Sequence, residues 1–63
     1  MKLEEALSIL RKNPGKRAKL NWLKDEWLFF DGDGCIRYEK GGTEHRLIIY
    51  AEDIETDDWE IEQ

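Results

Sequence analysis

Residues 51–63, AEDIETDDWEIEQ, decide how the rest of the chain is arranged. Their last part, WEIE, alternates apolar and acidic side chains from Trp59 onward, and a two-residue period is the mark of a half-buried strand. The first part is acidic and has one large apolar side chain, Ile54. We therefore expect a short helical turn over residues 51–56 that docks Ile54 on the core, and a final strand over residues 59–62.

The first part of the chain predicts an amphipathic helix over residues 3–12, LEEALSILRK. Its apolar residues recur at the i, i+3, i+4, i+7 spacing of one helix face: Leu3, Ala6, Leu7 and Leu10. Acidic residues in the first turn and basic residues in the last suit the helix dipole, and Asn13-Pro14-Gly15 ends the helix. A helix this short is not stable alone, so its apolar face must pack on a sheet.

Two strands are expected after the helix. Residues 17–22, RAKLNW, alternate polar and apolar side chains, and residues 27–30, WLFF, are apolar on both faces. A strand that is apolar on both faces is typically covered on both sides. The helix can cover one side, and no other part of the chain remains for the second. Because an exposed aromatic patch is a liability, we expect a subunit interface there.

Two further strands are expected over residues 35–40, CIRYEK, and residues 45–50, HRLIIY. The turn sequences Asp31-Gly32-Asp33-Gly34 and Gly41-Gly42 separate the strands at hairpin spacing. The sequence therefore predicts an α+β fold in a single domain over residues 1–63. Its N-terminal helix packs on an antiparallel β-meander of about five strands, with a short helical turn before the last strand.

Length and composition limit what kind of protein this is. A chain of 63 residues buries only about 60% of the surface that its unfolded form exposes, and its core contributes roughly 3–5 kcal/mol. Cys35 is the only cysteine and His45 the only histidine, which excludes an intrachain disulfide and a structural zinc site. We expect no cofactor, and we expect a homo-oligomer to supply further stability.

No apolar run approaches the roughly 20 residues that a membrane span requires. The acidic pair Glu4 and Glu5 interrupts any signal-peptide core at the N-terminus. We expect a soluble, cytoplasmic protein that does not bind membranes.

The formal net charge of −5 argues against general nucleic-acid binding. The charges are segregated, since six of the ten basic residues lie in residues 11–24 and seven of the fifteen acidic residues lie in residues 52–62. The two segments could bind each other, within or between subunits. The basic segment could instead receive an anionic ligand, or both segments could be solvated surface.

The sequence favours neither a metal site nor catalysis. The start of Asp31-Gly32-Asp33-Gly34 resembles a calcium loop, but the following positions lack the required ligands, so a hairpin turn is the better interpretation. Cys35 and His45 form the one possible nucleophile and base pair, on strands that could be adjacent, and nothing supplies a third member or an oxyanion hole. We expect no enzyme activity.

The residues most suited to binding lie in the basic segment. Cations can contact phosphate, and an indole ring offers a flat surface on which a base stacks for about 1–3 kcal/mol. The candidate ligand-binding residues are Arg17, Lys19, Asn21, Trp22, Lys24 and Trp27. The alternative is that Trp22 and Trp27 are simply core residues.

Two blocks of the chain resemble the second type of phage Thoeris anti-defence proteins. In residues 1–30, an amphipathic helix is followed by a glycine with basic residues, then by Trp22 and the hydrophobic WLFF segment. In residues 53–61, DIETDDWEI resembles the family's Asp-Leu-Leu-Ala-x-Asp-Trp ending, and the residues in register are Asp53, Ile54, Asp58 and Trp59. The chain lacks the family's Trp-x-x-Ser-Gln segment and has IIYAE instead.

The resemblance implies a small sponge of the infected bacterial cell. Such a protein would bind and sequester a cyclic nucleotide immune signal, a cyclic ADP-ribose variant or a cyclic oligonucleotide, without cleaving it, and would assemble into dimers or tetramers. The alternative from a different class is an acidic protein-binding inhibitor from a mobile element. It would block a host defence protein with residues 52–62, by a surface that mimics nucleic acid.

Overall fold

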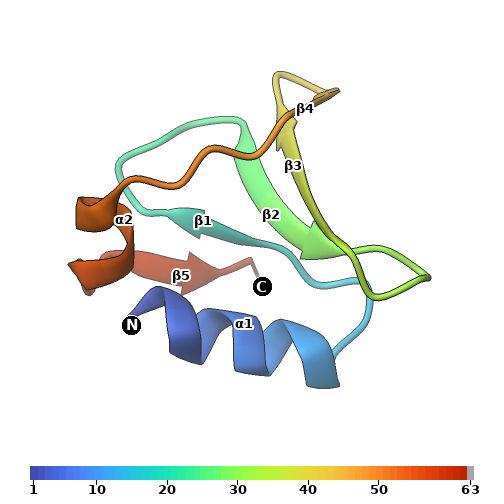
Figure 1. Ribbon diagram of the computed structural model, residues 1–63, viewed down its shortest axis with the longest axis horizontal. Helices are drawn as coiled ribbons and strands as arrows, with labels where there is room; N and C mark the ends of the chain where they lie inside the picture. Colours follow the sequence, from blue (N-terminus) through green and yellow to red (C-terminus); the bar gives the residue numbers. More distant parts are fainter. Residues whose placement is uncertain (63) are drawn as a thin grey trace.

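The structure, a computed structural model, describes residues 1–62 as two helices and one antiparallel sheet (Figure 1). The sheet has five strands in the order β4-β3-β2-β1-β5, so the last strand returns to lie beside the first. The predicted α+β fold, with a short helix before the last strand, is confirmed. In chain order the elements are α1 (Leu3–Lys12), β1 (Ala18–Leu20), β2 (Glu26–Phe30), β3 (Ile36–Lys40), β4 (Thr43–His45), α2 (Ala51–Glu55) and β5 (Trp59–Ile61).

One face of the sheet, which we call the inner face, carries the core. The register places Leu28 of β2 between Ala18 of β1 and Tyr38 of β3, and it places Leu20 of β1 opposite Trp59 of β5. Directly opposed residues share a face of an antiparallel sheet, so these side chains lie together. The core joins them to the apolar stripe of α1, with these buried members: Leu3, Ala6, Leu10, Ala18, Leu20, Leu28 and Trp59.

The helix α1 begins and ends as its sequence indicates. Glu4 and Glu5 lie in the first turn and basic residues in the last, where they complement the helix dipole. At the C-terminal end the side chain of Asn13 donates a hydrogen bond of 2.7 Å to the carbonyl of Ile9. Gly15 then takes a φ of 96°, which a residue with a Cβ rarely adopts, and the chain turns toward β1.

The predicted strand over residues 45–50 is wrong in its bounds. The strand β4 ends at His45, and residues 46–50 leave the sheet and cross over its inner face to α2; Figure 1 shows this segment along the upper side of the view, with α1 along the lower side. We call residues 46–50 the strap. Its side chains still alternate, since Leu47 and Ile49 are half-buried against the core and Ile48 and Tyr50 are exposed. A pattern of alternation identifies an extended chain, and it does not reveal whether a partner strand is present.

Trp59 and Ile54, two apolar residues of the C-terminal segment, differ in burial. Trp59 is buried, as expected, and its indole nitrogen donates a hydrogen bond of 2.6 Å to the carbonyl of Asp53. The expectation that Ile54 docks in the core is wrong, because 54% of Ile54 is exposed and α2 has no buried residue. The indole of Trp59 holds α2 in place by bonding to a backbone carbonyl of the helix. The helix α2 therefore does not need to bury one of its own side chains in the core.

The outer face of the sheet is covered in part by the chain itself. The guanidinium carbon of Arg17 lies 4.2 Å from the ring centroid of Trp27, and the ammonium of Lys19 lies 5.3 Å from it. The premise that nothing in the chain can cover this side of β2 is therefore wrong for Trp27.

Among residues 1–62 no helix has both the length and the apolar composition that crossing a membrane requires.

Candidate functional site

The six residues predicted to bind a ligand do not form one site. Arg17, Lys19 and Trp27 come together on the outer face of the sheet. Trp22 lies beyond the end of β1, where 60% of it is exposed and it lines a cavity on the inner face. The remaining two, Asn21 and Lys24, are exposed in the loop between β1 and β2.

On the outer face, Arg17 is held by carboxylates of its own chain. Its Nε and a terminal nitrogen donate to the two oxygens of Glu62 at 2.9 and 2.7 Å, and its other terminal nitrogen lies 3.4 Å from Glu39. The hydrogen bond with Glu62 raises the pKa of Arg17 and, in turn, lowers the pKa of Glu62. A phosphate would have to displace this two-point contact, which is the strong geometry for an arginine.

The basic and acidic segments pair within the chain at these positions. Besides the contact between Arg17 and Glu62, Lys19 lies 3.9 Å from Glu60. Both acids belong to the end of the chain that returns beside β1. The charge segregation left open whether the basic and acidic segments pair within one subunit or between subunits. For Arg17 and Lys19 the structure shows pairing within one subunit.

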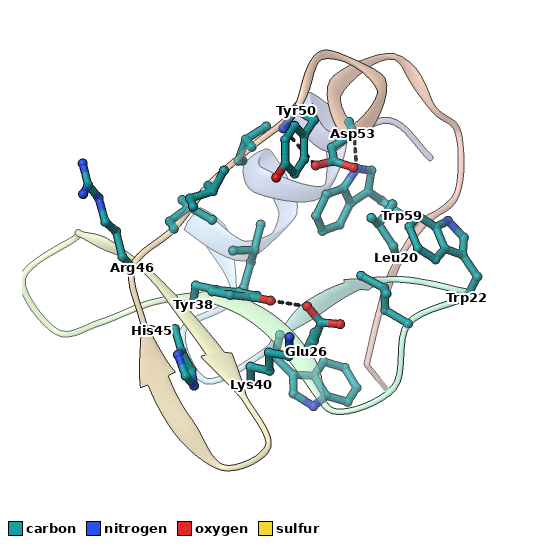
Figure 2. A pocket seen from close by; sticks show the side chains of 16 residues that line it. Leu20, Trp22, Glu26, Tyr38, Lys40, His45, Arg46, Tyr50, Asp53 and Trp59 are labelled. Carbon is teal, nitrogen blue, oxygen red and sulfur yellow. Dashed lines mark hydrogen bonds between the residues drawn. The ribbon is translucent and has the colours of Figure 1, made fainter.

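The inner face carries a cavity of about 420 Å³ between the strap and the sheet. Its floor is formed by side chains of β1, β2 and β3, and its walls by the strap, the loop after β1, α2 and β5 (Figure 2). Aromatic rings are prominent in the lining: Trp22, Tyr38, Tyr50 and Trp59. Trp27 also borders the cavity from β2, but its ring lies on the outer face under Arg17. Trp22 and Tyr50 are 60% and 62% exposed as whole residues, and both lie at the cavity mouth.

A hydrogen-bonded pair gives the cavity floor its polarity. The hydroxyl of Tyr38 donates to the carboxylate of Glu26, a diagonal neighbour on the adjacent strand. Burial, together with the hydrogen bond to Glu26, raises the pKa of Tyr38 to about 12, so the phenol keeps its proton at neutral pH. Lys40 lies opposite Glu26 in the sheet and also lines the cavity.

The far end of the cavity is fixed by Asp53. Its carboxylate accepts a hydrogen bond of 3.0 Å from the backbone N–H of Tyr50, and its carbonyl accepts the bond from the Trp59 indole. The strap is therefore tied to β5 at the end where it enters α2. At its other end, Arg46 stands on the rim and points away from the cavity in Figure 2.

The possible nucleophile and base are not paired. The register places His45 opposite Tyr38, with ring centroids 6.5 Å apart. Cys35 is exposed and precedes β3, so it does not lie opposite His45. In the described part of the chain, no group of three or more His, Cys, Asp and Glu side chains is placed to hold a metal ion.

Sequence reasoning missed the cavity residues Tyr38, Lys40 and Tyr50. The alternation of CIRYEK does place Tyr38 and Lys40 on one face, and this was the available signal. The cavity itself forms because the strap folds back over the sheet, which is a contact that no local pattern encodes. No protein-family model, curated protein or solved structure matches this chain.

Proposed function

We propose that the protein binds and sequesters a cyclic nucleotide signal in the cavity beneath the strap, without cleaving it. The observation that supports the proposal is the pair of accessible rings, Trp22 and Tyr50, at the mouth of a cavity of about 420 Å³. Ligand pockets are commonly about 300–1,000 Å³ and are mostly apolar with a few polar groups. A base stacked on such a ring gains about 1–3 kcal/mol.

The polar groups of the cavity suit a nucleotide. Lys40 supplies a cation for a phosphate. The carboxylate of Glu26, held by Tyr38, supplies an acceptor for a base amino group or a ribose hydroxyl. The outer face is the weaker candidate, because the guanidinium of Arg17 is occupied by Glu62.

Titration calorimetry against a panel of cyclic ADP-ribose isomers and cyclic di- and trinucleotides tests the proposal. We expect one member to bind, and we expect Trp22→Ala to weaken binding by about 1–3 kcal/mol, the usual value of a base stacked on an aromatic ring. Lys40→Gln should also weaken binding. Lys24→Gln removes the same charge from an exposed loop outside the cavity lining and should leave the affinity unchanged.

Two outcomes would contradict the proposal. The absence of binding by every member of the panel at high concentration would remove the nucleotide function. Binding that survives Trp22→Ala and Lys40→Gln but is lost in Arg17→Gln would move the site to the outer face. To test the absence of cleavage, the bound ligand is released by denaturation and identified by chromatography, and it should be recovered intact.

A second candidate is a protein-binding inhibitor that uses the acidic C-terminal segment. The observation in its favour is that α2 presents the exposed side chain of Ile54 among exposed acids, with no buried residue of its own. Pull-down from a host lysate separates the two functions. A stoichiometric partner that is lost on charge reversal at Asp57 and Asp58, but kept on reversal at Arg17 and Lys19, would favour the inhibitor.

A further inference from the structure

The strap is an extended segment of strand-forming sequence whose backbone, among the residues that the structure describes, lacks a partner over residues 46–49 and is bonded to Asp53 at Tyr50. Within residues 1–62, the N–H and C=O groups of residues 46–49 make no hydrogen bond. The sequence RLIIY is rich in the β-branched and aromatic residues that favour strands. Its outward side chains, Ile48 and Tyr50, are 64% and 62% exposed. An apolar segment with free backbone groups is an open strand edge, which proteins normally pair or cover.

We propose that the strap pairs with the strap of a second copy of this chain, as an antiparallel ladder about a two-fold axis at Ile48. In a two-fold arrangement each residue meets its counterpart from the other copy. Opposed residues in an antiparallel ladder share a face. The exposed side chains of one strap must therefore meet those of the other, and this requires the axis to pass through a residue. An axis at Ile48 uses the whole strap, because it places Leu47 opposite Ile49 and Arg46 opposite Tyr50.

Charge complementarity favours this antiparallel pairing. The strap has a basic end at Arg46, and its other end leads into the acidic first turn of α2, which contains Glu52. Antiparallel pairing brings the basic end of one copy beside the acidic end of the other. Arg46 points outward, so it can lie over the second copy's Tyr50 and reach the second copy's Glu52. The nearby acid Glu44 already pairs with Arg37 at 3.2 Å.

A second copy suits the strap better than a foreign peptide. With Ile48 on the axis, the outward residues of one strap match the outward residues of an identical strap. The two-fold axis then makes the contact between Arg46 and Tyr50 twice in each dimer. The chain is also in the size range where a single core is marginal and association adds stability. This interface is distinct from the outer face of β2, and it does not depend on a bound ligand.

Sedimentation velocity over a concentration series tests the interface with charged variants at its centre. Ile48→Glu and Ile48→Lys each place like charges directly opposite across the axis, which is unfavourable, so each should raise the dimer dissociation constant at least about tenfold. An equimolar mixture of the two variants places opposite charges together and should restore a heterodimer. The matched controls are Ile54→Glu and Ile54→Lys, at another exposed isoleucine outside the strap, and both should dimerise as the unmodified protein does.

Hydrogen exchange provides a second readout that does not rely on a variant. If the straps pair, exchange at amides of residues 46–49 should slow as the protein concentration rises. The proposal is overturned by an unmodified protein that remains a monomer throughout the series. It is equally overturned by variants at Ile48 that dimerise normally, by a mixture that fails to recover, or by a monomer that instead takes up an extended peptide on the strap.

Discussion

Arg17 shows how a residue chosen for its charge can be committed to structure. Its guanidinium makes a two-point contact with Glu62 and lies over the ring of Trp27. Arginine suits both contacts because its planar group can stack and donate at once. The charge segregation of the sequence was consistent with a contact between this cation and the acidic tail, but it could not show which acid would make the contact. That choice depends on the register of β5 against β1.

Asp31 plays a comparable role in the turn between β2 and β3. One carboxylate oxygen accepts hydrogen bonds from the backbone N–H groups of Asp33 and Cys35, at 2.8 and 3.0 Å, and the other accepts from Arg37 at 2.7 Å. The side chain of Arg37, followed by the two backbone donors, lowers the pKa of Asp31. The predicted hairpin turn is confirmed, and the carboxylate of Asp31 accepts three hydrogen bonds within it.

Asp31 should make stability depend on pH in the acid range. Because its folded-state pKa is lowered, its contribution is present above the unfolded value of about 3.9 and is lost as pH falls through the folded value. Urea unfolding is measured for Asp31→Asn and for the unmodified protein from pH 7 to pH 2. At pH 7 the variant should have the lower urea midpoint, and the difference between the two midpoints should disappear below about pH 4. The control Asp33→Asn changes the same charge in the same turn, and a gap of the same size there would contradict the assignment.

The helices α1 and α2 are attached to the rest of the molecule in different ways. The stripe of α1 could be predicted because helical periodicity is local and strong. The docking of α2 could not, because five residues carry too little pattern to show which side chain is buried. The helix is instead held by backbone atoms, through the indole of Trp59 and the carboxylate of Asp53.

Two truncations should separate the two modes of attachment. Leu10 is 1% exposed, so Leu10→Ala should cost about 2–5 kcal/mol of the free energy of unfolding. Ile54 is 54% exposed, so Ile54→Ala should change it by about 0.5 kcal/mol or less. Urea denaturation measures both variants. A loss for Ile54→Ala as large as that for Leu10→Ala would show that α2 docks by its side chain after all.

At the scale of the whole molecule, the inner face of the sheet has two covers. The helix α1 packs over one part and encloses the core, and the strap crosses another part and leaves a cavity. The sequence predicted the helix α1, the turns and the strands β1, β2, β3 and β5, since each follows from a short-range pattern. It did not predict the cavity, because the same alternation in residues 45–50 fits a paired strand and a crossing strap equally well.

The three indole N–H groups allow the central claim to be tested in one experiment. They belong to Trp22 at the cavity mouth, Trp27 on the outer face under Arg17, and the buried Trp59. In a nitrogen–proton correlation spectrum each gives its own signal. Addition of the nucleotide that binds in calorimetry should shift the Trp22 signal strongly and leave the Trp27 signal nearly in place. A shift confined to Trp27, or no shift in any of the three, would contradict binding beneath the strap.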